Sequence, residues 1–443
     1  MKYNPEELIS KAEEPKKKSL KLHPLFKGKI ETGIKVPVKK PSDFSIWYTP
    51  GVAEPCRKIS EDKQSVYEMT SKWNYVAVIS DGSRVLGLGN IGPEASLPVM
   101  EGKSLLFKYL GGVDAFPLCL NTQNTEEIIK AIKWLTPSFG GINLEDISSP
   151  KCYYILEKLR TDLNIPVWHD DQQGTALVTL AGVINALKIV EKKLNEVCIS
   201  LIGAGAANIN VAKYLDIAGA RPENMVMVDS KGILHADRRD LEERNPFKWQ
   251  MCLQTNPRNL IGGIAEAIKD TDICIAYSKP GPGTLKKEWI RSMADDAIVI
   301  AGSNPVPEIW PWEAEEAGAR IVATGRSDFP NQINNSLGFP AVFRGAFDSM
   351  ANKISDEMCI AASNAISEYA RAKGINEQNI IPKMDETEMY IEEAIAVGIK
   401  AAEQRLTRKQ ISKKELQEKV SENIRRARRT LEILMEKGVI KQL

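Results

Sequence analysis

Two acidic pairs, Glu145-Asp146 and Asp170-Asp171, are the residues of this sequence best suited to bind a ligand or to take part in a reaction. Each pair closes a short apolar run that predicts a strand, and the segment between the runs has the apolar spacing of one helix face. Two parallel strands joined by such a crossover end at the same sheet edge, where open α/β sheets bind ligands. With no Lys or Arg directly beside either pair to neutralise it, four converging carboxyl groups predict a hard divalent cation, Mg²⁺ or Mn²⁺. For either pair alone, solvated loop charges or helix caps are the better interpretation.

Two basic residues are candidates for the same edge. Arg84 lies in a glycine-rich loop after the apolar run Tyr75–Ser80, where it can form a bidentate pair with a substrate carboxylate. A surface arginine is the equal alternative. Lys103 lies on the apolar face of a helix expected to open at Pro93. Such a lysine either extends its amine to solvent or is buried with a lowered pKa, which makes it a candidate base.

Two local expectations concern how site residues are held. The segment from residue 44 to residue 56 is strand-like and is broken by a turn that leaves Tyr48 at the end of an element, where a tyrosine most often packs. The helix between the acidic pairs is expected to be capped by Ser148 or Ser149, with Pro150 in its first turn.

A second α/β unit carries a dinucleotide fingerprint. The strand Val197–Ile202, a glycine-bearing turn and the helix Ile209–Ala218 lead to a strand that ends at Asp229. This is the required context: a tight turn, a helix N-terminus for the pyrophosphate and an acid about 20 residues further on. The turn residues expected at the cofactor are Gly203, Ala204, Gly205, Ala206, Ala207 and Asn208.

The choice of cofactor depends on the residues after this strand. Asp229 is expected to accept from a ribose 2′-hydroxyl and to repel a 2′-phosphate, which favours NAD. Ser230 and Lys231 follow directly, and Lys231 can neutralise a phosphate, so NADP stays possible. Asn208 stands where the fingerprint usually has Gly or Ala, and should either loosen the packing of helix on strand or add a polar contact.

The whole chain sets further bounds. Its 443 residues, net charge of +1 and lack of a long apolar run predict no nucleic-acid partner and no membrane span. The 7 cysteines form no CxxC motif, so we expect reduced thiols in a cytoplasmic protein.

The predicted fold is α/β: an N-terminal α/β substrate and metal domain, a Rossmann-type doubly wound dinucleotide-binding domain and a helical C-terminal segment that packs back on both. The expected boundaries are residues 1–172, 173–345 and 346–443.

An ordered set of motifs resembles the malic enzyme family, in particular its shorter bacterial and archaeal members. The matching pieces are YTPGVAEPC (48–56), DGSRVLGLGNIG (81–92), PVMEGKSLLFKYLGG (98–112), NLEDI (143–147), HDDQQGTA (169–176), GAGAA (203–207), GSNP (302–305) and NNSLGFP (334–340). Each motif is moderately specific, and their order along the chain makes the set highly specific.

This resemblance implies roles for individual residues. Tyr48 would be the general acid and Lys103 the general base, with Glu145, Asp146 and Asp171 as ligands of Mn²⁺ or Mg²⁺. Arg84 and Asn335 would contact the substrate, together with Lys103, and Asn304 would lie between substrate and nicotinamide. Asp170 is the one acidic residue of the two pairs that the resemblance does not make a metal ligand, and we expect it to orient Lys103 or the metal ligands.

The reaction implied is (S)-malate to pyruvate and CO₂ with reduction of NAD(P)⁺. An ordinary 2-hydroxy-acid dehydrogenase needs no such carboxylate cluster, so the predicted metal site favours decarboxylation. The alternatives are a malolactic-type enzyme, which keeps its cofactor bound and releases lactate, and a non-catalytic nucleotide-sensing protein. A homodimer is expected, with an N-terminal arm exchanged between protomers.

Overall fold

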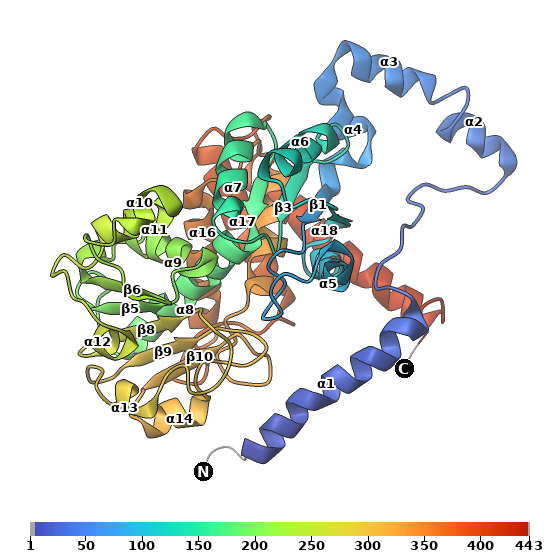
Figure 1. The fold of residues 1–443 in the computed structure, drawn as a ribbon. Helices are drawn as coiled ribbons and strands as arrows, with labels where there is room; N and C mark the ends of the chain where they lie inside the picture. The colour runs from blue at the N-terminus through green and yellow to red at the C-terminus, as the bar shows by residue number, and fades with distance from the viewer. Residues whose placement is uncertain (1–4, 442–443) are drawn as a thin grey trace.

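The structure, a computed structural model, describes the chain from residue 5 to residue 441, and its side chains from residue 15. Two parallel sheets form the centre of the molecule (Figure 1). The first has the order β2-β1-β3-β4, and all of its pairings are parallel. Its strands are β1 (Tyr75–Ser80), β2 (Asp114–Cys119), β3 (Gly141–Leu144) and β4 (Val167–His169). The apolar runs before both acidic pairs therefore form neighbouring parallel strands, as predicted.

The second sheet is of the doubly wound, Rossmann type. Its order is β10-β9-β8-β5-β6-β7, and only β7 is antiparallel to its neighbour. The strands are β5 (Ile199–Ile202), β6 (Met225–Asp229), β7 (Gly232–Ile233), β8 (Ile273–Ala276), β9 (Ile298–Ala301) and β10 (Ile321–Thr324). The order reverses between β5 and β8, and ligands bind beside the carboxyl ends of strands at such a point.

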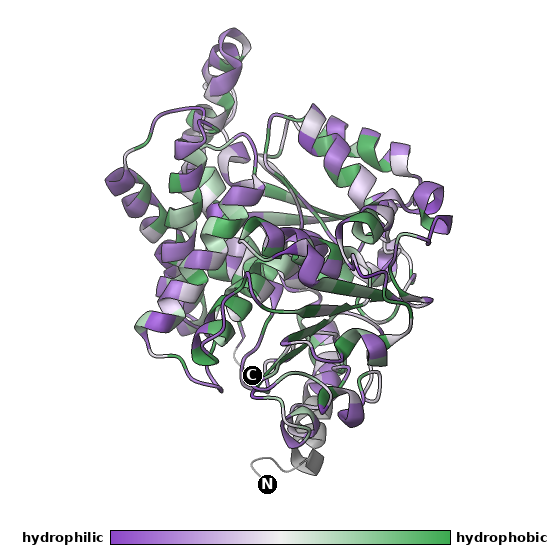
Figure 2. Cartoon of the chain, turned by 90° about the vertical axis from the view of Figure 1, so that its left-hand side faces the viewer, coloured by the Kyte–Doolittle hydropathy of each residue, from purple (hydrophilic) through white to green (hydrophobic). Residues whose placement is uncertain are grey.

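Helices cover the faces of both sheets. Those of the first part are α5 (Pro93–Gly111), α6 (Thr125–Leu135), α7 (Lys151–Asp162) and α8 (Thr175–Ile189). The second sheet is accompanied by α9 (Ala206–Ile217), α10 (Asp240–Arg244), α11 (Pro246–Gln254), α12 (Ile264–Ile268), α13 (Lys287–Ile290) and α14 (Pro311–Glu316). In Figure 2 the strands inside the molecule are mostly green, whereas outward helix faces carry more purple. Burial of these apolar faces is what holds the helices on the sheets.

The last four helices pack on one another and on α5 and α8, and α15 also contacts the first sheet. They are α15 (Phe339–Asp348), α16 (Asp356–Ala372), α17 (Thr387–Glu403) and α18 (Lys413–Glu436). Phe107 of α5 makes edge-to-face contacts with Phe339 and Phe343 of α15, at centroid distances of 4.6 Å and 5.2 Å. Trp168 of β4 lies 6.5 Å from Phe343 and is fully buried. The helical segment begins at Phe339, earlier than the residue 346 predicted from the sequence.

The N-terminal arm extends away from this body (Figure 1). It comprises α1 (Pro5–Phe26), an extended stretch, α2 (Phe44–Trp47) and α3 (Ala53–Glu61), and α4 (Val66–Met69) joins it to the first sheet. The prediction of a strand-like segment at 44–56 is wrong, because a short apolar run does not distinguish a strand from a helix. Tyr48 does lie at the end of an element, as predicted, where it caps α2.

Two helix starts also differ from the prediction. The N-cap of α7 is Pro150, and neither preceding serine side chain caps it; the backbone oxygen of Ser148 accepts from the Cys152 N–H at 3.1 Å instead. The helix α9 begins at Ala206 rather than Ile209, directly after Gly205. The turn that meets the pyrophosphate in such folds is therefore shorter than expected.

Candidate active site

A cavity of about 360 Å³ lies between the carboxyl edges of the two sheets. It is lined by ten of the predicted residues, Arg84, Lys103, Glu145, Asp146, Asp171, Gly205, Ala206, Ala207, Asn304 and Asn335. These residues come from both sheets, and the cavity thus joins the acidic cluster to the dinucleotide turn. Tyr48, Asp170, Gly203, Ala204, Asn208, Asp229, Ser230 and Lys231 are not among its lining residues.

Three carboxylates converge at one side of this cavity. Glu145, Asp146 and Asp171 each offer an oxygen, and these atoms all lie within 4.8 Å of one another. Asp146 is 3% exposed and its Oδ2 has no hydrogen-bond partner, while its Oδ1 accepts from the Leu86 N–H at 3.3 Å. The backbone of Asp146 is left-handed, with φ of 54°. An unpartnered buried carboxylate oxygen beside two others fits a hard divalent cation held by oxygen ligands.

Lys103 occupies the centre of the acidic cluster. Its Nζ lies 2.6 Å from Asp170 Oδ2 and 3.1 Å from Glu145 Oε1, and it lies 4.4 Å from the centroid of the Phe339 ring. Asp170 is fully buried and also accepts from the Trp168 indole N–H at 3.0 Å. Lys103 was a candidate for this edge, and the contact with Asp170 places it there, although α5 supplies it from 67 residues earlier in the chain.

Burial and charge oppose each other at Lys103. Burial lowers the pKa of this lysine, but the carboxylates of Asp170 and Glu145 outweigh it, so the Lys103 pKa is raised. Of the two alternatives for Lys103, the structure has the buried lysine, but its pKa is raised rather than lowered because neighbouring segments bring carboxylates to it. Burial, followed by repulsion from Asp171, raises the pKa of Asp146 to about 7. Burial likewise raises the pKa of Glu145, against the opposing charge of Lys103.

The dinucleotide turn is shorter than predicted but keeps the glycine that its geometry requires. Gly203 has φ of 99°, and a Cβ there would lie 2.3 Å from the Tyr277 carbonyl oxygen, so only glycine fits. Asn208 is fully buried, and its amide N–H₂ donates to the carbonyls of Ile202 and Gly203, both at 2.9 Å. Of the two outcomes predicted for Asn208, the structure has the added polar contact. This side chain ties the turn to its strand.

Asp229 is surrounded by cations that the sequence analysis did not identify. Arg238 donates to both of its carboxylate oxygens at 3.2 Å and 3.3 Å, and Lys248 donates at 3.3 Å. Burial raises the pKa of Asp229, but the bonds from Arg238 and its neighbours outweigh this and hold the pKa low. Lys231, the cation predicted to face a phosphate, pairs instead with Asp240 at 3.2 Å.

Two loops of the second sheet close the cavity on the cofactor side. Glu308 is fully buried and joins them: it accepts from the Ser278 N–H at 2.8 Å and from the Ser303 hydroxyl at 2.6 Å. Ser278 and Ser303 both line the cavity, next to Asn304. Glu308 was not singled out in the sequence, where it follows two prolines in a loop and carries no periodic signal. Asn334, by contrast, caps the turn that begins at Asn335.

Of the predicted substrate arginine, Arg84, and the predicted general acid, Tyr48, only Arg84 lies at the cavity. Arg84 lines the cavity, and its backbone N–H donates to the Asp146 carbonyl at 3.0 Å. Tyr48 lies in the arm, with 70% of its surface exposed. Within one chain, the structure therefore brings Arg84 and Lys103 to the carboxylates but does not bring Tyr48 there.

The sequence of this chain is similar to that of known proteins over most of its length. The family profile "Malic enzyme, N-terminal domain" matches residues 27–160, and "Malic enzyme, NAD binding domain" matches residues 172–404. The chain belongs to the malic enzyme family. It is 53% identical to the NAD-dependent malic enzyme of Geobacillus stearothermophilus, over 81% of this chain and 73% of that protein. It is 46% identical to the bifunctional malic/malolactic enzyme of Bacillus subtilis, over 91% of this chain and 97% of that protein.

A solved structure in the malic enzyme family has the same fold. The crystal structure of Entamoeba histolytica malic enzyme matches with a TM-score of 0.96 and 44% identity, over 99% of this chain and 92% of that chain. All 7 cysteines of the chain are free. From residue 5 to residue 441, the helices are too short or too polar to cross a bilayer.

Proposed function

We propose that the protein converts (S)-malate to pyruvate and CO₂ with reduction of NAD(P)⁺, and that a divalent cation assists this reaction. The observation that carries the proposal is the shared cavity, in which a carboxylate cluster, a buried lysine and a dinucleotide turn meet. A cofactor for hydride transfer and a base for the hydroxyl proton are what oxidation of a 2-hydroxy acid needs. The family assignment supports the same reaction.

Glu145, Asp146 and Asp171 would hold Mn²⁺ or Mg²⁺. When bound, the cation supplies Lewis-acid stabilisation of charge on the substrate oxygen. Its charge would also counter that of Glu145, which now helps to keep Lys103 protonated. Lys103 would then lose its proton more readily and become able to accept the one from the substrate hydroxyl.

The remaining residues would bind the substrate and guide protons. Asp170 would hold Lys103 Nζ in place, through the contact of 2.6 Å. Arg84 would pair with a substrate carboxylate, and Asn304 and Asn335 would donate to substrate and nicotinamide from the opposite wall. The bound cofactor would supply the hydride acceptor, and Tyr48 would return a proton to the substrate carbon that has lost CO₂.

We propose NAD as the preferred cofactor, with NADP accepted. Asp229 favours a ribose 2′-hydroxyl as its partner. Arg238 and Lys248 offset the charge of this carboxylate and would ease binding of a 2′-phosphate. The two effects oppose each other, so we expect a modest preference.

The functional unit would be a homodimer in the cytoplasm, with the N-terminal arm of each protomer on its partner. Four large side chains in and directly after α2 support this assembly, because they are exposed in the single chain. Phe44 is 55% exposed, Ile46 63%, Trp47 45% and Tyr48 70%. Contiguous apolar surface of this kind marks an interaction site. The arm would then supply Tyr48 to the cavity of the other protomer. We also retain 1–172, 173–345 and 346–443 as the proposed domains.

One experiment tests the substrate, the metal and decarboxylation together. Purified protein is assayed for malate-dependent reduction of NAD⁺ or NADP⁺ with Mn²⁺, with and without EDTA, and the product is identified. We expect pyruvate and a loss of activity with EDTA. Lactate without net NADH would favour the malolactic alternative, and no reaction of malate at all would favour a nucleotide-sensing protein.

A further inference from the structure

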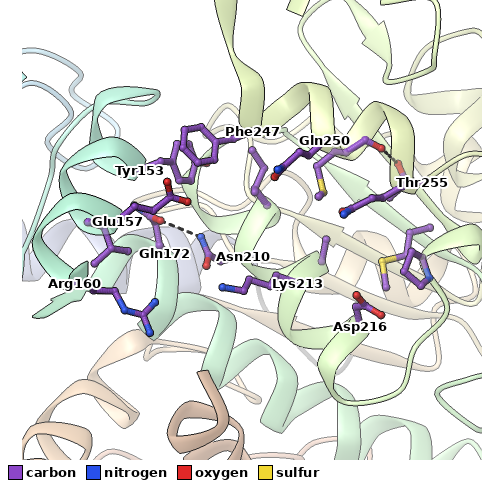
Figure 3. Close-up of a pocket in the computed structure, with 17 residues that line it drawn as sticks. Tyr153, Glu157, Arg160, Gln172, Asn210, Lys213, Asp216, Phe247, Gln250 and Thr255 are labelled. Atoms are coloured by element: carbon purple, nitrogen blue, oxygen red, sulfur yellow. Dashed lines mark hydrogen bonds between the residues drawn. The ribbon is translucent and has the colours of Figure 1, made fainter. Parts of the chain in front are cut away.

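A second cavity, of about 270 Å³, lies between α7, α9 and α11 and shares no lining residue with the active-site cavity (Figure 3). One wall is aromatic: the rings of Tyr153 and Phe247 stack at a centroid distance of 4.4 Å. Leu156, Ile209 and Met251 add an apolar surface. The volume lies just below the range of about 300–1,000 Å³ that is usual for drug-sized ligands, so a small metabolite fits.

A buried amide in this cavity lacks a partner. Gln172 is 1% exposed; its Oε1 accepts from the Asn210 N–H₂ at 3.1 Å, as the dashed line in Figure 3 marks, but its Nε2 has no hydrogen-bond partner. Buried polar groups in proteins are nearly always hydrogen-bonded. A ligand with an acceptor oxygen at this end would satisfy the donor.

Charges of both signs surround the mouth. Arg160 and Lys213 share one carboxylate, that of Asp356, at 3.4 Å and 2.5 Å, so two cations face a single anion at this side of the mouth. In Figure 3, Lys213 extends toward the side of the cavity on which Gln172 and Arg160 lie. Glu157 and Asp216 supply negative charge to the same lining. A ligand with one negative and one positive group could pair with the cations and with the acids of this lining at the same time.

The cavity adjoins both halves of the active site. Gln172 belongs to the π-helical turn Asp170–Gly174 and directly follows Asp171 of the acidic cluster. Asn210, its partner, lies in α9, whose first residues Ala206 and Ala207 line the active-site cavity. A ligand that fixes Gln172 and Asn210 would therefore restrain the acidic turn and the cofactor helix together.

From these contacts we infer that the cavity is a regulatory site for a small zwitterion, namely an α-amino acid with a short apolar side chain. Its carboxylate accepts from Gln172 Nε2 and lies near Lys213 and Arg160. Its ammonium group faces Glu157, and its side chain packs on the aromatic wall. Occupancy changes the affinity of the active site for malate or for the cofactor.

L-Valine is the probe, and calorimetry on the full-length protein measures its binding without reliance on turnover. Failure of the proposed reaction therefore leaves this measurement intact. We expect saturable binding of L-valine, and binding at least about tenfold weaker for 3-methylbutanoate and for 2-methylpropylamine, each of which lacks one charged group. No binding of L-valine, or equal binding of the three compounds, overturns the assignment.

Two variants locate the site and one serves as control. Lys213→Met removes a cation from the mouth, and Ala212→Leu fills part of the cavity; each should weaken L-valine binding by about tenfold or more. Lys287→Met removes an ion-paired lysine elsewhere in the same part of the chain, and should not change it. With wild-type protein, L-valine should change the apparent KM for malate or for the cofactor by about fivefold or more. Binding that survives both cavity variants overturns the location, and binding that changes neither KM overturns the regulatory role.

Discussion

Lys103 and Asp170 form a buried ion pair, with 2.6 Å between Nζ and Oδ2. Lys103 is 8% exposed and Asp170 is fully buried. The pair joins α5 to the segment after β4, and therefore holds the proposed base at a fixed distance from the acidic cluster. An amine that is held in this way loses little freedom when a substrate binds, which favours its use in proton transfer.

Replacement of Lys103 by alanine should lower kcat by about 10²- to 10⁴-fold, the usual contribution of a positioned general base. Steady-state kinetics with saturating malate and cofactor measure this loss. Lys108→Ala is the matched control: Lys108 lies further along the same helix, is half exposed and pairs with Asp114 at 2.6 Å. Its replacement should leave kcat unchanged. Wild-type turnover by Lys103→Ala would remove this lysine from the mechanism.

Metal binding should depend steeply on pH through Asp146. Its pKa is raised to about 7, chiefly by burial and then by Asp171, so a cation must displace a proton below that pH. The dissociation constant for Mn²⁺ should therefore rise by at least about tenfold for each pH unit below about 7, because Glu145, whose pKa is also raised, can hold a second proton that the cation displaces. Calorimetry across this range measures the slope. Asp146→Asn should abolish binding, whereas Asp162→Asn, a surface change, should preserve it.

The same raised pKa sets the sign of a stability effect. The folded chain binds the Asp146 proton more tightly than the unfolded chain, whose ordinary pKa is 3.8. This group therefore stabilises the fold less as pH rises from 3.8 toward 7. Added Mn²⁺ should raise Tm more at about pH 8 than at about pH 5. Equal shifts at both values would contradict the assignment of Asp146 as a ligand.

The preference for NAD⁺ or NADP⁺ should change in opposite directions when either partner of the Asp229–Arg238 ion pair is replaced. Asp229→Ser removes the partner of a ribose hydroxyl and should shift the ratio of kcat/KM for NAD⁺ over NADP⁺ toward NADP⁺, by about tenfold or more. Arg238→Ala removes the guanidinium that holds this carboxylate, and should shift the ratio toward NAD⁺. Lys231→Ala is the control, since Lys231 pairs with Asp240. A larger shift from Lys231 than from Arg238 would contradict the proposed site.

The strands were predictable from the sequence because their apolar runs are local signals. The apolar run Tyr75–Ser80 forms a strand with these bounds, and the carboxyl ends of β1, β3 and β4 meet at one edge. Topology rules alone then bring Glu145 and Asp171 together. This is why the metal cluster could be proposed from one sequence.

Contacts between distant segments could not be predicted in the same way. The charge of Lys103 and the pair of Arg238 with Asp229 depend on how helices and loops pack, and no spacing in the sequence encodes these distances. Glu308 gave no signal, because a lone acid in a proline-rich loop is most often solvated. The strand predicted around Tyr48 failed for a related reason: its apolar side chains are exposed in the single chain, so their pattern does not report on a core.

The exposed arm leads to a prediction about assembly. If Tyr48 acts in the cavity of the partner protomer, Tyr48→Phe and Lys103→Ala are each inactive as homodimers, but they complement each other when mixed. Half of randomly reassociated dimers would be mixed, and each mixed dimer would hold one intact site of two. About a quarter of wild-type activity should return. If Tyr48 acts within its own chain, every site in a mixed dimer carries a lesion and no activity returns. Activity of the two variants is measured separately and again after mixing and reassociation.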